Sequence, residues 1–253
     1  MSKNYDLLQH AEFGLSAAPT FNTEENAVVV ENLAKATPRD SSSLELVLHE
    51  EALKLVQRLF LTGDKAAPKS VLFAPIDAHF GCNWLCAITA KLLAKSVSGS
   101  VCLVEGNFRK PSLPDTLGLS PDRGLVDSLE RHGPIKDFAK QIGPDNLWLL
   151  ASASPMQDST ILLNSDRMKE RLSEVRKEFD YVVMNAPPLT AFADGMALGR
   201  LVDGVVLVLD ANGTRREAAV RVTESLRTTN IRILGAVLNN RTFAIPAAVY
   251  KRL

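Results

Sequence analysis

The stretch Val71–Trp84, which reads VLFAPIDAHFGCNW, decides how this sequence is interpreted. It opens with a short apolar run, Val71–Ala74, of the kind found in buried strands. It ends where the apolar helix Cys82–Ala94 is predicted to begin. A strand, a loop and a helix N-terminus in this order form the layout of a phosphate-binding loop. Whether phosphate chemistry follows depends on the residues within the loop.

The residues of this loop do not suit a phosphate. A working P-loop needs small residues that let backbone N–H groups surround the phosphates, a lysine for their charge, and a Ser or Thr hydroxyl for Mg²⁺. Here one glycine, Gly81, keeps the expected place. The lysine position holds Cys82, the hydroxyl position holds Asn83, and the bulky Trp84 follows. The sequence therefore predicts a nucleotide-binding architecture without nucleotide chemistry.

The composition is that of an ordinary globular protein. Of its 253 residues 46% are hydrophobic, and the formal net charge of zero provides no general attraction for nucleic acid or acidic lipid. No apolar run approaches the roughly 20 residues that span a bilayer, and the N-terminus lacks a signal-peptide pattern. Three cysteines favour a reducing cytosol. We expect a cytoplasmic protein with no membrane span and no nucleic-acid partner.

Strands and helices alternate along most of the chain. The predicted strands are Lys69–Ala74, Ser100–Glu105, Leu147–Leu150, Tyr181–Met184, Gly204–Leu209 and Ile231–Leu238. The predicted helices are Leu44–Leu61 (capped by Ser41–Ser43), Cys82–Ala94, Leu125–Arg131, Ile135–Gln141, Ser165–Glu178, Ala193–Leu201, and one that Thr214–Glu217 opens as a capping box and that runs through Thr228. Asn107–Ser120 is expected to be a loop. This order predicts an α/β fold with a mostly parallel, doubly wound sheet covered by helices on both faces.

The N-terminal part differs in composition from the rest. Residues 1–43 are predicted to form an arm and linker, and residues 44–253 the domain. A short helix at Tyr5–Leu15 is followed by the polar stretch Ser16–Ser43, which contains one apolar patch, Ala27–Val30. This stretch has two interpretations, a disordered tail or an arm ordered against a partner.

Polar residues follow several of the predicted strands. In open α/β sheets, ligands bind beyond the carboxyl ends of the strands. Those ends carry Pro75–Trp84, Glu105–Asn107, Asn185–Pro188 and Asn239. We expect these four segments to converge on one rim.

Several motifs point together to one family. They are Arg109–Leu113 (RKPSL) followed by Leu117–Leu119, Gly124–Leu129 (GLVDSL), Phe179–Val183 (FDYVV) with Pro187 and Pro188, Leu201–Val205, and Gly235–Asn239. With them the chain, from Leu44 onward, resembles the cytoplasmic domain of the bacterial tyrosine kinases (BY-kinases). These are deviant-Walker P-loop ATPases that regulate capsule and exopolysaccharide synthesis. The resemblance implies homo-oligomers and a membrane polysaccharide copolymerase or a kinase paralogue as partner.

The family's active residues are replaced in this chain. At the matching Walker positions stand His79 for a glycine, Cys82 for the lysine, Asn83 for the serine, Trp84 for the threonine, Glu105 and Asn107 for two aspartates, and Asn185 for the Walker B aspartate. Asn239 matches an asparagine that the family places near the adenine. Only Tyr250 lies near the end, where the family carries several autophosphorylated tyrosines.

These replacements predict a catalytically silent protein. Phosphoryl transfer depends on positioning and electrostatic stabilisation. Asn185 lacks the charge that holds a hydrated Mg²⁺, and Asn107 cannot act as a carboxylate base. We expect no catalytic residue, no Mg²⁺ and at most weak ATP or ADP binding. The chain would then be a regulator or scaffold of polysaccharide synthesis, recruited by its partner to the inner face of the membrane.

Two other functions remain open. One is an active autokinase or ATPase in which Glu105 holds the metal. The other is a positioning protein of the Min or Par type, against which the Arg-Lys-Pro segment and the two prolines argue.

Three further groups of residues have competing interpretations. Glu51, Lys54 and Arg58 resemble the helix motif that packs BY-kinase subunits into rings, although an exposed ion pair explains them equally well. Arg109 and Lys110 either bind an anion or form an ordinary surface pair. His79, Cys82 and Cys86, with Cys102 on a neighbouring strand, have spacing compatible with a metal, but core packing is favoured and we expect no metal site. Cys82 alone is also a candidate redox sensor.

Overall fold

The structure is a computed structural model of the chain. It describes residues 27–31, 41–62, 67–78, 81–143, 146–152, 155–156 and 159–241. The predictions for Tyr5–Leu15, His79 and Tyr250, and for most of Ser16–Ser43, lie outside these residues.

One eight-stranded sheet organises the described residues, in the order β1-β8-β7-β2-β6-β3-β5-β4. Its strands are β1 (Ala27–Glu31), β2 (Ser70–Pro75), β3 (Val101–Val104), β4 (Lys140–Gln141), β5 (Leu147–Leu150), β6 (Tyr181–Asn185), β7 (Gly204–Asp210) and β8 (Ile233–Arg241). Every neighbouring pair is parallel except β4 with β5. The predicted α/β fold with a mostly parallel sheet is confirmed.

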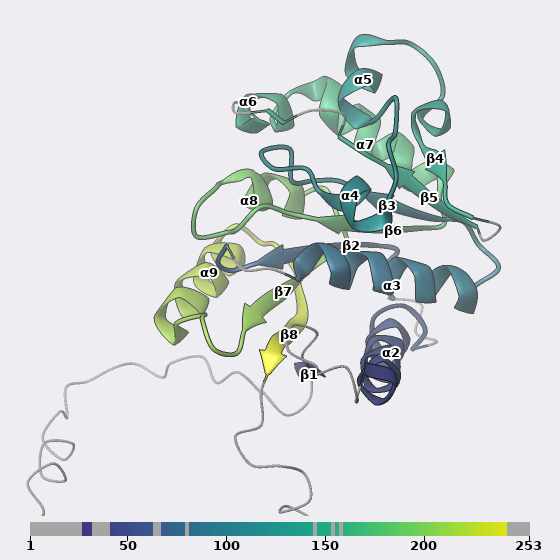
Figure 1. The fold of residues 1–253 in the computed structure, drawn as a ribbon. Coiled ribbons are helices and arrows are strands. Elements are labelled where there is room, and N and C mark those ends of the chain that lie inside the picture. Colours follow the sequence, from purple (N-terminus) through teal and green to yellow (C-terminus); the bar gives the residue numbers. More distant parts are fainter. Residues whose placement is uncertain are drawn as a thin grey trace, which may run out of the picture.

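Helices cover both faces of this sheet (Figure 1). One face carries α2 (Ser41–Phe60), α3 (Cys82–Ser96) and α4 (Leu113–Leu117). The other face carries α5 (Leu125–Glu130), the 3₁₀ helix Ile135–Phe138, α6 (Ser159–Leu163), α7 (Asp166–Glu178), α8 (Asp194–Gly199) and α9 (Arg216–Thr228).

The central strand β2 shows why the sheet forms. Successive side chains of a strand point to opposite faces. Val71 and Phe73 join the apolar cluster under α2 and α3, and Leu72 and Ala74 join the cluster on the other face. Each fully buried side chain of this size contributes about 1.5–3 kcal/mol. A continuous apolar run is therefore the expected sequence for a strand that is buried on both sides.

Two predicted helix starts are wrong. α2 begins at Ser41 rather than at Leu44, so Ser41–Ser43 are its first three residues. Thr214 does not open a capping box: α9 begins at Arg216 without a side-chain cap, and Thr214 Oγ1 accepts a hydrogen bond from the Asp210 amide at 3.0 Å. The turn that follows β7 thus uses the hydroxyl that the helix would need.

The expected loop Asn107–Ser120 contains a helix, α4, and the expected helix Ile135–Gln141 is a 3₁₀ helix followed by β4. The turn signals of α4 are a proline in its first turn and Gly118, with φ 66°, as its C-cap. Its brevity left no periodic apolar pattern to detect. For the same reason α6 was not predicted at all.

The N-terminal segment contributes a strand. The backbone of β1 pairs in parallel with β8, with Ala27 opposite Ala236 and Val29 opposite Leu238. The patch Ala27–Val30 is therefore part of the sheet, although the boundary between arm and domain near residue 44 stays a prediction. None of the described helices combines the length and the apolarity needed to cross a bilayer.

Candidate functional site

Three residues predicted to share the rim do meet there. Asn83 lies in the first turn of α3, Glu105 follows β3, and Asn185 ends β6. The Asn185 amide nitrogen donates to Asn83 Oδ1 at 2.8 Å and to Glu105 Oε1 at 2.5 Å. Because β2, β6 and β3 are neighbours in the sheet, their carboxyl ends bring these side chains together.

The other side of the Asn185 amide is also engaged. Its Oδ1 accepts the backbone N–H groups of Gly106 at 2.6 Å and Asn107 at 3.3 Å. A Cβ atom on Gly106 would lie 2.3 Å from the Asn185 carbonyl oxygen, so only glycine fits this close approach. Asn185 is fully buried. Asn185, at the position of the Walker B aspartate, therefore connects the loop after β3 to β6 through its side-chain hydrogen bonds.

Glu105 is fully buried, and both of its carboxylate oxygens accept hydrogen bonds. Oε2 accepts the N–H groups of Ser112 at 2.8 Å and Leu113 at 2.7 Å, where α4 begins, and Oε1 accepts from Asn185. Burial raises the pKa of Glu105, and the hydrogen bonds from Leu113, Asn185 and Ser112 offset part of that rise. All of these donors are uncharged.

Ser112 closes the arrangement. The Asn83 amide nitrogen donates to Ser112 Oγ at 2.5 Å, so Asn83, Glu105, Ser112 and Asn185 form a closed set of hydrogen bonds, which we call the rim cluster. Ser112 was not predicted as a site residue, although it stands in the RKPSL motif. The rim cluster joins α3, the loop after β3, α4 and β6.

At the start of α3, Gly81 meets Asn239. Gly81 has φ 116°, a conformation that favours glycine, and a Cβ there would lie 2.3 Å from Asn239 Nδ2. The thiol of Cys82 donates to the Phe73 carbonyl at 3.6 Å. The cavity beside these residues measures about 10 Å³, which is room for about one water molecule.

The charges around this small cavity are negative. Asp77 and Asp210 line it, and no described lining residue is a cation. Asp77 accepts a hydrogen bond from the Thr190 hydroxyl at 3.1 Å, and Asp210 accepts from Asn240 Nδ2 at 2.8 Å. Two carboxylates at this position repel a phosphate, where a P-loop would offer a lysine.

Trp84 and Asn107 have supporting positions. Trp84 is half-buried and packs against the apolar cluster under α2 and α3. Asn107 Oδ1 accepts the Lys110 N–H at 3.2 Å and so shapes the loop that leads to Arg109. Neither side chain extends the hydrogen bonds of the rim cluster.

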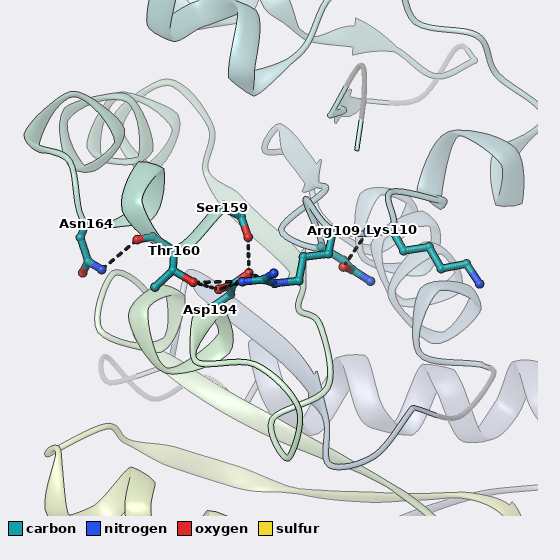
Figure 2. A network of polar contacts seen from close by, with 7 residues as sticks. Arg109, Lys110, Ser159, Thr160, Asn164 and Asp194 are labelled. Carbon is teal, nitrogen blue, oxygen red and sulfur yellow. Dashed lines mark hydrogen bonds and ion pairs between the residues drawn. The ribbon is translucent and has the colours of Figure 1, made fainter. Parts of the chain in front are cut away.

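Arg109 forms an ion pair with the buried Asp194 (Figure 2). Its Nε donates to Asp194 Oδ2 at 2.9 Å, and Nη2 donates to Asp194 Oδ1 at 3.2 Å and to Thr160 Oγ1 at 3.0 Å. The guanidinium also lies 4.4 Å from the centre of the Phe192 ring. Arg109 is therefore not an ordinary surface pair, and its binding of an external anion stays a prediction. Lys110 beside it is exposed.

Asp194, at the start of α8, accepts the hydrogen bonds from Arg109. It is fully buried and also accepts the hydroxyls of Ser159 at 2.5 Å and Thr160 at 2.6 Å, both on α6 (Figure 2). Burial alone would raise its pKa, but the bonds from Arg109, Ser159 and Thr160 and the charge of Arg109 bring the pKa below its usual value. No local sequence signal announces this pair, whose members are 85 residues apart.

The cysteines do not gather at one site. Cys82 and Cys86 belong to the apolar cluster under α2 and α3, while Cys102 belongs to the cluster on the other face of the sheet. Burial, with the neighbouring Cys82, raises the pKa of the Cys86 thiol, and burial raises that of Cys102. In the described parts of the chain, no three His, Cys, Asp or Glu residues gather around a point where a metal would sit. The burial of all three thiols fits the core-packing interpretation.

The candidate oligomer residues lie on the exposed side of α2. Lys54 and Glu51 form an ion pair of 2.6 Å, with side chains 53% and 24% exposed, and Arg58 is exposed one turn further on. They lie apart from the rim cluster, and their role in assembly stays a prediction.

Comparison with curated proteins finds similarity to bacterial tyrosine kinases, although no family model matches the chain. The chain is 30% identical over 141 residues to the tyrosine-protein kinase YwqD of Bacillus subtilis, covering 56% of this chain and 60% of that protein. It is 24% identical to the tyrosine-protein kinase CpsD of Streptococcus pneumoniae (56% and 63% covered) and 28% identical to the succinoglycan biosynthesis transport protein ExoP of Rhizobium meliloti (63% and 20%). These matches support a P-loop ATPase of the BY-kinase family. The chain spans less than two thirds of the length of these three relatives.

Solved structures with the same fold include two BY-kinase-related proteins. The kinase domain of Escherichia coli ETK superposes with a TM-score of 0.74 at 17% identity, covering 92% of this chain and 98% of that one. The chimerical protein CapA2B2 gives a TM-score of 0.73 at 17% identity, with 85% and 93% covered. At this identity the likeness shows the fold alone.

Proposed function

We propose that this chain is a catalytically silent BY-kinase homologue that acts as a regulator or scaffold in exopolysaccharide or capsule synthesis. The observation that carries the proposal is the closed rim cluster. Asn185 and Glu105, which occupy the family's metal-binding positions, satisfy each other and the surrounding backbone.

A metal ion would have to break these bonds. Mg²⁺ demands near-octahedral oxygen ligands. To bind a metal, Oε2 of Glu105 would have to leave the N–H groups of Ser112 and Leu113, while Oε1 already accepts from the Asn185 amide at 2.5 Å. Each buried N–H left without an acceptor costs about 1–3 kcal/mol. This cost argues against the alternative of an active kinase that uses Glu105 to hold the metal.

A nucleotide would meet further obstacles. The cavity of about 10 Å³ beside Gly81 and Asn239 is too small for phosphates, and the carboxylates Asp77 and Asp210 line it. Adenine contacts through Asn239 are then the remaining source of affinity, so we expect binding of ATP or ADP that is weak and indifferent to Mg²⁺.

The partner is proposed from the relatives. ExoP is named for succinoglycan biosynthesis, and YwqD and CpsD are named tyrosine kinases. We expect this chain to bind a membrane polysaccharide copolymerase or a kinase paralogue, and to be held by it at the inner face of the membrane. In that role the intact fold presents surfaces while the rim performs no chemistry.

Equilibrium binding and phosphorylation test the proposal. Calorimetric titration with ATP and ADP, with and without Mg²⁺, is expected to show no Mg²⁺-dependent binding, and radiolabelled ATP is expected to leave the chain unlabelled. The relative YwqD, treated identically, serves as the control. Tight Mg²⁺-dependent binding, or tyrosine labelling that Glu105→Gln abolishes, would show that the rim is active and overturn the proposal.

A further inference from the structure

Two arginines share one cavity at the amino edge of the sheet. Arg58 lies in the last turn of α2, and Arg232 directly precedes β8. Both side chains are exposed, and neither guanidinium forms a hydrogen bond or an ion pair with any residue that the structure describes. Because β2, β7 and β8 are parallel, the start of β8 lies at the edge opposite to the rim cluster.

The cavity beside these arginines has donors and no acid. It measures about 160 Å³, several times the roughly 30 Å³ that one water molecule occupies in the liquid. Thr62, which follows α2, brings a hydroxyl to it, and Pro68, ahead of β2, lines it as well. Among the described lining residues none carries a carboxylate. Two guanidinium groups and a hydroxyl around one cavity attract an anion.

Neighbouring charges do not neutralise this pair of arginines. Asp203, which precedes β7 at the same edge, already accepts two backbone N–H groups and pairs with Arg176 on α7. The carboxyl end of α2 carries a partial charge of about −0.5, against two full positive charges from the guanidinium groups. The cavity therefore keeps a positive field.

The number of donors favours a phosphate over a carboxylate. Guanidinium groups are planar and weakly hydrated, and they recognise both kinds of anion through paired hydrogen bonds. A phosphate monoester presents three acceptor oxygens and up to two negative charges, whereas a carboxylate presents two oxygens and one charge. Arg58, Thr62 and Arg232 supply three donor side chains. A phosphate monoester can therefore accept from all three at once.

A smaller cavity adjoins the first and indicates what the phosphate is attached to. It measures about 50 Å³ and shares the lining residues Arg58, Leu59 and Leu234 with the larger cavity. Its other described lining residues are apolar or glycine, namely Leu55, Val206, Gly235, Ala236 and Val237. Because removing hydrocarbon from water is favourable, this cavity favours a ligand with a short apolar group next to its phosphate.

We propose that Arg58, Thr62 and Arg232 form a binding site for a phosphate monoester that carries a short apolar group. The two guanidinium groups and the hydroxyl hold the phosphate, and the hydrocarbon lies against Leu59 and Leu234. The site lies at the edge of the sheet away from the rim cluster, so it is separate from the nucleotide position and goes beyond the proposed function.

Calorimetric titration of the full chain with butyl phosphate tests the site. Saturable binding is expected, about tenfold tighter than that of inorganic phosphate, because about two carbon atoms leave water. Arg58→Gln and Arg232→Gln should each weaken the binding about tenfold, since each removes a charge-assisted hydrogen bond. Arg227→Gln, exposed on α9 over the other face of the sheet, changes the charge equally and should leave the affinity unchanged.

Two features of the chain make these variants informative. Both arginines are exposed and make no contact of their own with described residues, so both variants should fold normally. Arg58 is also a candidate for subunit contacts on α2, whereas Arg232 lies outside that helix. A loss of affinity in both variants is therefore explained by the shared cavity and not by assembly through α2.

Vesicles distinguish a lipid from a soluble ligand. Phosphatidic acid presents a phosphate monoester beside hydrocarbon, and vesicles of phosphatidylcholine without it are the control. Retention on phosphatidic acid that both arginine variants lose would assign the site to a lipid head group. Binding of butyl phosphate without retention on vesicles would assign the site to a soluble ligand.

Three results would overturn the proposal. They are no saturable binding of butyl phosphate, no preference over inorganic phosphate, and equal affinity in wild type, Arg58→Gln and Arg232→Gln. None of them depends on whether the rim cluster admits ATP.

Discussion

Two fully buried carboxylates lie close to the carboxyl edge of the sheet and behave in opposite ways. Asp194 faces the guanidinium of Arg109 and two hydroxyls, and its pKa lies below the usual value. Glu105 faces one side-chain amide and backbone N–H groups, and its pKa lies above the usual value. Both are well hydrogen-bonded and both are fully buried. The difference between them is the cation.

This difference separates a carboxylate paired with a cation from a carboxylate held by neutral donors alone. Where the fold needs a charge, at Asp194, the chain supplies an arginine. At the rim, where P-loop proteins bind nucleotide and metal, Glu105 accepts hydrogen bonds from neutral donors only. Most of the substitutions below change the surroundings of one of these two carboxylates at a time.

The largest effect is expected from Arg109→Met. It leaves Asp194 buried with two hydroxyls and no cation, which typically costs about 3–5 kcal/mol of unfolding free energy. Urea denaturation at neutral pH measures this loss. Lys110→Met, at the exposed neighbour, is the control and should stay within about 0.5 kcal/mol. A cost below about 1 kcal/mol for Arg109→Met would mean that the pair does not stabilise the fold.

Asn185→Asp should come second. It returns the carboxylate that the family's Walker B motif has at this position, but here the new charge lies against Glu105 Oε1, 2.5 Å from the present amide nitrogen. Two carboxylates this close cannot both ionise, and Glu105 loses a donor, so we expect a loss of about 3 kcal/mol at neutral pH. The loss should shrink at pH 5, where the two share a proton. A variant as stable as wild type that binds Mg²⁺ would contradict this expectation.

Glu105→Gln is expected to cost less and to change the pH profile. Its amide nitrogen would face that of Asn185, or one backbone N–H would lose its acceptor, at about 1–3 kcal/mol. Since folding raises the pKa of Glu105 above 4.5, wild type binds this proton more tightly when folded, and the contribution of Glu105 to stability falls as pH rises from about 4.5 through the folded pKa. Glu105→Gln should lack that fall.

Asp194 provides the opposite slope for comparison. Its lowered pKa gives a contribution that is present above its ordinary value of 3.8 and is lost as pH falls through the folded pKa. Urea curves between pH 3 and pH 8 for wild type, Glu105→Gln and Arg109→Met separate the two carboxylates. Parallel profiles for wild type and Glu105→Gln would show that Glu105 does not titrate as expected.

The smallest effect on stability is expected from Lys54→Ala. An ion pair with side chains 53% and 24% exposed is worth about 0.5 kcal/mol or less. If α2 packs subunits together, as the sequence predicts, the assembled mass should nevertheless fall in sedimentation. Lys91→Ala, exposed on α3, is the matched control. An unchanged mass would leave Glu51 and Lys54 as a solvated pair.

The sheet and the rim were the parts that sequence could predict. Strands such as β2 and β3 are buried on both faces and read as continuous apolar runs. In a parallel sheet the carboxyl ends of neighbouring strands lie at the same edge. A parallel sheet therefore predicts that Asn83, Glu105 and Asn185 lie close together, even though their contacts are not known from the sequence.

The Arg109 network could not be predicted in the same way. Its partners come from segments 85 and 51 residues away, and α6, which supplies Ser159 and Thr160, is too short to show a helical period. The capping box at Thr214 failed because Asp210 competes for the same hydroxyl. In both cases a contact outside the local pattern decided the structure.

The strand β1 has a practical consequence for handling the protein. It covers one side of the nine-residue strand β8, whose other side pairs with β7. A chain shortened to begin at α2 would leave the N–H and C=O groups along that side of β8 open to another molecule. Long uncovered sheet edges promote edge-to-edge aggregation. A fragment that starts after residue 31 should therefore aggregate more on expression than a fragment that keeps β1.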